Sequence, residues 1–172
     1  MDKGYVQVYT GNGKGKTTAM LGLALRACGA GLRVYIGQFV KSMTYSEISA
    51  IGKYLPDVRT ELYGTGCFFG REVTQEDIDM AKDGLQKATE AMLSGAYDLV
   101  LLDEIHIAVH YGLLSVEDVV GLIRRKPENV ELVLTGRYAA EEVKEAADLV
   151  SEVTEVKHYY ASGVLARDGI ER

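Results

Sequence analysis

The chain has 172 residues, the usual size of one domain, and its 47% hydrophobic and 26% charged residues are ordinary for a globular protein. Its formal net charge of −6 argues against an extended nucleic-acid surface, which would need clustered Lys and Arg side chains. The apolar runs are too short to cross a membrane, and Met1 is followed almost at once by a predicted strand rather than a signal peptide. We therefore expect a single cytoplasmic domain over residues 1–172, with no membrane or nucleic-acid partner.

The first predicted strand, Val6 to Thr10, leads into a glycine-rich turn and then a helix (VQVYTGNGKGKTT). Glycines let the backbone curl until successive N–H groups point at an anion, and the helix N-terminus adds its positive dipole. Lys16 is expected to reach the outer phosphates of a nucleotide, and Thr17 to bind Mg²⁺. The sequence therefore predicts a P-loop that binds phosphate through Thr10, Gly11, Asn12, Gly13, Lys14, Gly15, Lys16, Thr17 and Thr18.

Thr10 stands where the usual P-loop pattern has its first glycine. A flexible loop of Gly and Lys is the plain alternative, but a strand precedes this turn and a helical spacing of apolar residues follows it. The substitution at Thr10 therefore indicates a P-loop family of a non-standard kind.

A second buried strand is predicted from Arg33 to Val40, and Lys41 follows it. Ligands of open parallel sheets bind beyond the carboxyl ends of the strands, so Lys41 would face the same crevice as the P-loop. A solvated loop lysine is an equally open alternative. A short helix over Ser46–Tyr54 and a short strand over Val58–Tyr63 are predicted next.

The loop after this strand places Cys67, Phe68 and Phe69 between glycines. Such aromatic side chains either fold back onto the core or form an apolar wall for a flat ligand, and the residues alone leave both open. Cys28 and Cys67 have neither metal-ligand spacing nor a disulfide pattern, so free thiols are expected.

Two further helices are predicted from capping residues and apolar spacing, one from Thr74 to Ser94 with Asp77 completing its capping box, and one beginning at Ser115. Their pattern indicates packing rather than chemistry. A helix over Ala139–Ala147 and an edge strand over Leu149–Lys157 follow later. For the glycine-punctuated tail after it, propensity alone predicts disorder.

Between the two capped helices, an apolar strand ends in Asp103 and Glu104, as expected of a Walker B strand whose carboxylate binds Mg²⁺ or its water shell. Which of the two contacts the metal stays open. His106 and His110 lie one helical turn apart, but a third ligand is missing, so we expect satisfied or exposed histidines rather than a metal site.

A further strand, Glu131 to Leu134, delivers Arg137 to the ligand end of the sheet. An arginine at this position suits a phosphate oxygen, and a surface ion pair is the competing interpretation.

Five segments together resemble the P-loop type of ATP:corrinoid adenosyltransferases: TGNGKGKTT at 10–18, QFVK at 38–41, DE at 103–104, TGR at 135–137 and KH…G…AR.GIE from 157 to 171. The resemblance spans nearly the whole chain. It implies an α/β P-loop NTPase fold, with a RecA-like, mostly parallel sheet flanked by helices on both faces, in a homodimer. It also implies transfer of the 5′-deoxyadenosyl group of ATP to the Co(I) centre of a reduced corrinoid, with release of triphosphate, in adenosylcobalamin biosynthesis or salvage.

The same resemblance implies roles for individual residues. Lys16, Glu104 and Phe69 would act in catalysis, and Thr17 and Glu104 would bind Mg²⁺, with Asp103 beside them. The P-loop, Lys41 and Arg137 would contact ATP. The tail of residues 157–172 would lie near the active site.

Phe68 and Phe69 would face the corrinoid and displace its lower cobalt ligand, although Cys67 stands where the family has its first aromatic residue. Longer family members carry an N-terminal helix over the corrinoid, and this chain begins at the first strand. A more open corrinoid pocket, or closure by another element, is therefore expected. A flavoprotein is a candidate reductant.

Two other functions fit the P-loop. An ATPase or small-molecule kinase would transfer the γ-phosphate, with Glu104 orienting a water or hydroxyl. A nucleotide-binding regulator would bind ATP without turnover. Cobalt(I) is itself a strong nucleophile, so adenosyl transfer needs no nucleophilic side chain from the protein, only positioning and stabilisation of the leaving triphosphate.

Overall fold

A parallel sheet with helices on both faces forms the centre of the computed structural model, which describes residues 1–41, 45–66 and 72–171. Within these residues the sheet has six strands in the order β3-β2-β4-β5-β1-β6, and all pairs are parallel. The strands are β1 (Val6–Thr10), β2 (Val34–Phe39), β3 (Val58–Tyr63), β4 (Leu99–Asp103), β5 (Glu131–Thr135) and β6 (Leu149–Glu152).

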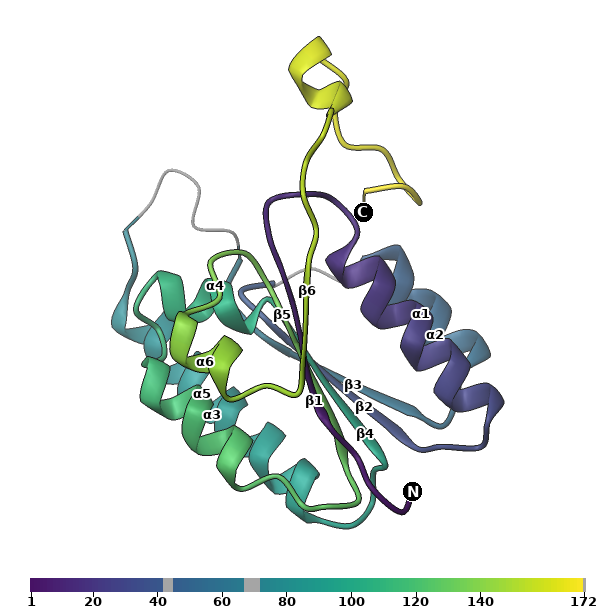
Figure 1. The fold of residues 1–172 in the computed structure, drawn as a ribbon. Coiled ribbons are helices and arrows are strands. Elements are labelled where there is room, and N and C mark those ends of the chain that lie inside the picture. Colours follow the sequence, from purple (N-terminus) through teal and green to yellow (C-terminus); the bar gives the residue numbers. More distant parts are fainter. Residues whose placement is uncertain (42–44, 67–71, 172) are drawn as a thin grey trace.

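The helices divide between the two faces of the sheet (Figure 1). One face carries α1 (Lys16–Gly29) and α2 (Ser46–Tyr54). The other carries α3 (Gln75–Leu93), α4 (Ile105–His110), α5 (Val116–Arg124) and α6 (Glu141–Glu145). This arrangement confirms the predicted α/β fold.

The central strands are apolar on both faces because helices cover both. All five residues of β4 and all six of β2 are buried. Two hydrophobic clusters result: one joins the sheet to α1 and α2, and the other joins it to the helices of the opposite face. The near-continuous apolar runs of the sequence follow from this two-sided burial.

The capping boxes predicted for α3 and α5 are present. Thr74 accepts from the backbone N–H of Asp77, and Ser115 accepts from that of Asp118. At the middle of α3, Gly84 lies so close to the sheet that a Cβ there would approach the ring of Tyr63 to 2.4 Å. Caps and close approach together fix α3 on the sheet.

Strand β3 also contributes a buried polar chain at this side of the sheet. Tyr63 hydrogen-bonds the hydroxyl of Tyr35 and donates to Glu61 at 2.8 Å, and Tyr35 is 2% exposed. Burial raises the pKa of Tyr35 to about 12, against the smaller opposing effect of the Tyr63 hydrogen bond.

The last strand is shorter than the predicted Leu149–Lys157. It pairs only with β1, and β1 ends at Thr10, where the P-loop curls away. Val153 still donates to the carbonyl of Thr10 and accepts from the N–H of Gly13 at 2.7 Å, but no strand remains beyond that point to pair with. The helix predicted over Ala139–Ala147 is likewise confined to Glu141–Glu145.

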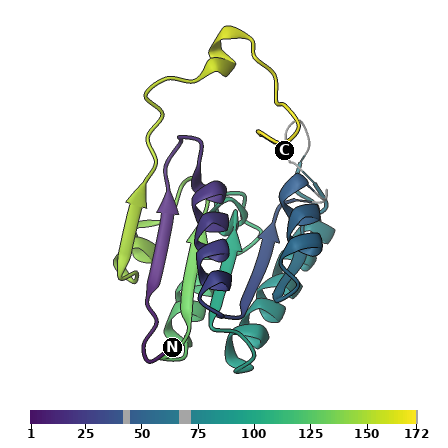
Figure 2. The same ribbon diagram turned by 90° about the vertical axis from the view of Figure 1, so that its right-hand side faces the viewer.

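The segment after β6 leaves the sheet edge and arches over the carboxyl ends of the strands (Figure 2). It contains a short 3-10 helix, η1 (Tyr159–Ser162), and returns toward the N-terminus of α1. Propensity alone was therefore wrong for this tail, because contacts distant in sequence hold it. None of the described helices is long and apolar enough to span a membrane.

Candidate active site

A cavity of about 690 Å³ lies at the carboxyl ends of the strands. The N-terminus of α1 forms its floor, and α2 and the tail contribute to its sides. The residues predicted for the site that line it are Gly13, Lys14, Gly15, Lys16, Thr17, Thr18, Lys41, Glu104 and Arg137. The structure therefore brings together residues from four separate segments of the sequence.

The P-loop wraps around the ammonium group of Lys16. Gly11 and Gly15 have φ angles of 94° and 125°, in the region that favours glycine. The Nζ atom of Lys16 donates to the carbonyl of Gly11 at 2.7 Å and to that of Gly13 at 2.8 Å. Lysine has three N–H donors, and the described residues accept two of those of Lys16, which leaves one for an anion in the cavity. Burial lowers the pKa of Lys16, more than the nearby Glu104 and Asp103 carboxylates raise it.

Asp103 is fully buried and is the hub of the polar network beneath the cavity. Its Oδ1 accepts from the hydroxyls of Thr17 at 2.9 Å and Thr135 at 2.7 Å. Its Oδ2 accepts from Gln38 at 3.0 Å and from Lys41 at 2.7 Å. Burial alone would raise the pKa of Asp103, but the Lys41 ammonium and the hydroxyl donors lower it. One carboxylate thus ties α1 to the ends of three strands.

Glu104 differs from Asp103 in almost every respect. Its backbone is left-handed, with φ 57° and ψ 22°, which is uncommon for a residue other than glycine. Its Oε2 atom is buried and accepts no hydrogen bond from any residue that the structure describes. Burial, followed by the charge of Asp103, raises its pKa. An unsatisfied carboxylate oxygen at the cavity wall suits a cation or a hydrogen-bond donor of a ligand.

Lys41 is not a solvated loop lysine. Besides the bond to Asp103, its Nζ atom lies 3.8 Å from a carboxylate oxygen of Glu47 and 5.4 Å from the ring centroid of Tyr45. Although burial lowers the pKa of Lys41, the charge and hydrogen bond of Asp103 raise it overall. Arg137, in contrast, is exposed at the cavity, and its charge acts on Glu104 by lowering the pKa of that carboxyl against the larger effect of burial.

The two histidines of α4 have different surroundings. His106 is 1% exposed, and burial lowers its pKa to about 4. His110 is exposed and stacks on Tyr138 with 4.2 Å between the ring centroids. The described residues contain no group of three His, Cys, Asp or Glu side chains that could hold a metal ion.

Several predicted residues are not part of the cavity lining. Among the described residues, these are Thr10, Gly11, Asn12 and Asp103. The Thr10 hydroxyl instead accepts from the N–H of Ala139 at 3.3 Å, which connects β1 to the segment before α6. Phe68 and Phe69, like Cys67, lie outside the described residues.

Sequence reasoning assigned no role to Gln38, Thr135 or the tail carboxylate of Glu171. Gln38 is paired with Asp103 in the β2–β4 register, so its amide reaches the carboxylate directly. Gln38 lies within an apolar strand and Thr135 at the end of one. A polar residue at such a buried position could have indicated a role in the site. His158, Gly169, Ile170 and Glu171 of the tail also line the cavity.

Comparison with known proteins agrees with this geometry. A curated "Corrinoid adenosyltransferase" of Sinorhizobium sp is 38% identical over 174 residues, which cover 99% of this chain and 81% of that protein. Proteins of the same name from Escherichia coli K12 and Pseudomonas aeruginosa are 34% and 33% identical over 99% of this chain and 86% and 84% of their own lengths. Residues 2–172 match the family described as ATP:corrinoid adenosyltransferase BtuR/CobO/CobP, and the chain belongs to this family.

Proposed function

We propose that this protein transfers the 5′-deoxyadenosyl group of ATP to the Co(I) centre of a reduced corrinoid, in the formation or salvage of an adenosylated corrinoid cofactor. The observation that carries the proposal is the convergence of Lys16, the helix N-terminus and the unpartnered Glu104 carboxylate on one cavity, in a chain of this family. A cationic floor suits a triphosphate.

The transfer is a displacement at carbon. The Co(I) electron pair forms the Co–C5′ bond while the C5′–O bond of ATP breaks, and inorganic triphosphate leaves with the bonding pair. Lys16 and the P-loop N–H groups stabilise the charge that develops on the leaving group, and Arg137 provides a further cation at the cavity. Orientation of the ribose toward cobalt supplies the remaining assistance, because no side chain has to act as a nucleophile.

The chemistry of the donor set fits Mg²⁺, a hard cation that prefers oxygen ligands. The buried, unpartnered oxygen of Glu104 and the hydroxyl of Thr17 would hold the ion, and both residues line the cavity. Asp103 would act from beneath, because its two oxygens already accept four hydrogen bonds, one of which orients Thr17. The ion would neutralise part of the charge on the leaving triphosphate.

The roles of Phe68 and Phe69, the homodimer and the reductant are inferred from the resemblance to the corrinoid adenosyltransferase family. Phe68 and Phe69 would form the apolar wall against the lower face of the corrinoid. The protein would act as a homodimer and receive electrons through a reductant such as a flavoprotein. Sedimentation of the purified protein tests the dimer.

Anaerobic incubation with Mg-ATP and a chemically reduced corrinoid tests the reaction. The expected products are a Co–C absorption spectrum and an equal amount of triphosphate. Lys16→Ala should abolish both, whereas Phe69→Ala should reduce adenosylation while ATP binding persists. ADP and phosphate without a Co–C product would instead support a kinase or ATPase, and ATP binding without turnover would support a regulator.

A further inference from the structure

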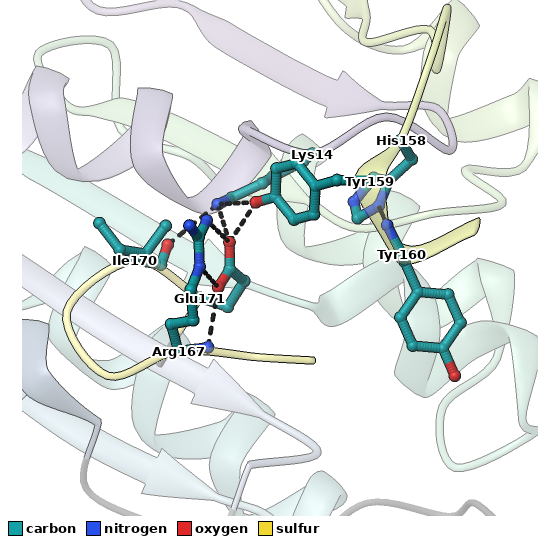
Figure 3. Close-up of polar contacts among 7 residues, drawn as sticks. All are labelled: Lys14, His158, Tyr159, Tyr160, Arg167, Ile170 and Glu171. Carbon is teal, nitrogen blue, oxygen red and sulfur yellow. Dashed lines mark hydrogen bonds and ion pairs between the residues drawn. The ribbon is translucent and has the colours of Figure 1, made fainter. Parts of the chain in front are cut away.

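One carboxylate near the end of the chain gathers the tail into a cluster (Figure 3). Glu171 accepts from the Nζ atom of Lys14 at 2.8 Å and from the hydroxyl of Tyr159. It also accepts from Arg167 through the backbone N–H at 2.8 Å, Nη2 at 3.1 Å and Nε at 3.2 Å. The Arg167 guanidinium lies 5.0 Å from the ring centroid of Tyr159. A single side chain therefore joins the P-loop to two other parts of the tail, at Tyr159 and Arg167.

All three donors of Lys14 are used within this cluster. Its Nζ atom donates to Glu171 at 2.8 Å, to the hydroxyl of Tyr159 at 3.0 Å and to the carbonyl of Ile170 at 3.0 Å. An ammonium group has three N–H bonds, so none remains for a phosphate. Lys16, two residues later, uses only two of its donors on described residues. The two lysines of the P-loop therefore have different roles.

Apolar burial does not hold the tail. The side chains of Tyr160 and Leu165 are 70% and 75% exposed, and no residue of η1 is buried. The polar cluster around Glu171 is what brings the returning segment against the P-loop. Isolated surface ion pairs contribute little, but several donors on one carboxylate form a network with fixed geometry. The hydrogen bonds from Arg167, Lys14 and Tyr159 also lower the pKa of Glu171, so it stays ionised.

We propose that Lys14 and Glu171 are positioning residues that fasten the carboxyl-terminal tail to the P-loop and so build one wall of the nucleotide cavity. This inference rests on the proposed function, because it takes ATP as the occupant of the cavity. The tail places His158 and Ile170 in the lining of the cavity, which Lys41 from the end of β2 also lines. Lys14 thus supports ATP binding by positioning the tail rather than by a hydrogen bond to phosphate.

The test is Glu171→Gln, measured by ATP titration calorimetry and by hydrogen exchange, neither of which needs a corrinoid. If the carboxylate fastens the wall, the Kd for ATP should rise by about three- to tenfold. Exchange of the peptide that contains Arg167 should accelerate, because its N–H loses a charged acceptor. If Lys14 is instead a phosphate ligand that Glu171 withholds, the same variant should bind ATP more tightly.

A double-mutant cycle completes the test. Lys14→Met should weaken ATP binding and speed exchange of the tail to a similar degree, and the double variant should be little worse than either single one. Glu155→Gln, which changes an exposed carboxylate between β6 and the tail and outside the cluster, is the matched control and should behave as the parent protein. Additive effects in the cycle, unchanged exchange in Glu171→Gln, or tighter ATP binding would each overturn the proposal. An unchanged Kd for ATP in Glu171→Gln would likewise overturn it, whereas a parent protein that shows the expected ATP-binding effects but transfers no adenosyl group would count against the proposed function alone.

Discussion

At Glu104, an unusual backbone and an unsatisfied carboxylate occur in the same residue. A left-handed, non-glycine backbone costs free energy and persists where the surrounding structure enforces it, commonly at functional sites. The turn carries Glu104 out of the strand direction and into the cavity, while Asp103 stays in the sheet. Two adjacent carboxylates thereby acquire different surroundings, one within the polar network beneath the cavity and one facing the cavity.

Glu104→Gln should therefore separate activity from stability. We expect adenosyl transfer to fall about 100-fold, because the developing charge on the triphosphate loses its cation site. The melting temperature should stay level or rise, since the variant removes the charge of a carboxylate that has a buried oxygen without a hydrogen bond. Anaerobic single-turnover kinetics and thermal unfolding measure the two effects. Glu142→Gln, an exposed residue of α6, is the control, and a large loss of stability in Glu104→Gln would contradict this interpretation.

The buried hydroxyl of Tyr35 predicts a loss of stability in alkali. Its pKa is about 12 in the folded protein and 10.0 in the unfolded reference, so the unfolded chain releases this proton first. The contribution is fully present below pH 10.0 and is lost as the pH rises toward 12. By about pH 11, the parent should lose on the order of 1 kcal/mol more than Tyr35→Phe. Urea unfolding of both proteins over this range measures the difference, and parallel pH profiles would exclude it.

Much of the architecture was predictable at the scale of single elements. The bounds of α2 and β3 match the predicted ranges Ser46–Tyr54 and Val58–Tyr63, because glycine and proline punctuate these segments. The start of α3 follows from the capping box at Thr74. Local sequence patterns determine these bounds, so they can be predicted without knowledge of distant contacts.

The features of the fold and the site that the sequence did not predict depend on contacts between residues distant in the chain. Gln38 meets Asp103 through strand register, across 65 positions, and Glu171 meets Lys14 across 157 positions. The early end of β6 depends on where its partner β1 stops. Periodicity cannot reveal such pairings, since it indicates which face of an element a residue occupies and not which distant residue it contacts.

The packing of α3 on the sheet gives a prediction with opposite signs at two helical glycines. Gly84→Ala places a Cβ 2.4 Å from the ring of Tyr63, and should destabilise the protein by about 1–3 kcal/mol. Gly22→Ala in α1 meets no atom within 4 Å and should stabilise it by about 0.5–1 kcal/mol through helix propensity. Urea unfolding measures both. Equal effects would show that α3 does not approach the sheet this closely.

For the whole molecule, one sheet shared by both hydrophobic clusters predicts one unfolding transition. All six described strands belong to the same sheet. The hydrogen bond from Thr17 to Asp103 anchors the P-loop to the centre of this sheet. We expect calorimetric and van't Hoff enthalpies to agree, as for a single domain over residues 1–172. A separately melting segment would appear as a second transition.

ATP should then stabilise the entire domain rather than the P-loop alone. At a free concentration of about 100 times Kd, binding adds about 2.7 kcal/mol, which corresponds to roughly 5–10 °C in Tm for a chain of this size. Lys16→Ala should lose this shift because it removes the cation enclosed by the P-loop. Lys82→Ala, an exposed residue of α3 on the opposite face of the sheet from α1, should keep it. Differential scanning calorimetry with and without ATP tests this prediction. If ATP raised the temperature of only part of the unfolding peak, the P-loop would unfold separately from the sheet that carries it.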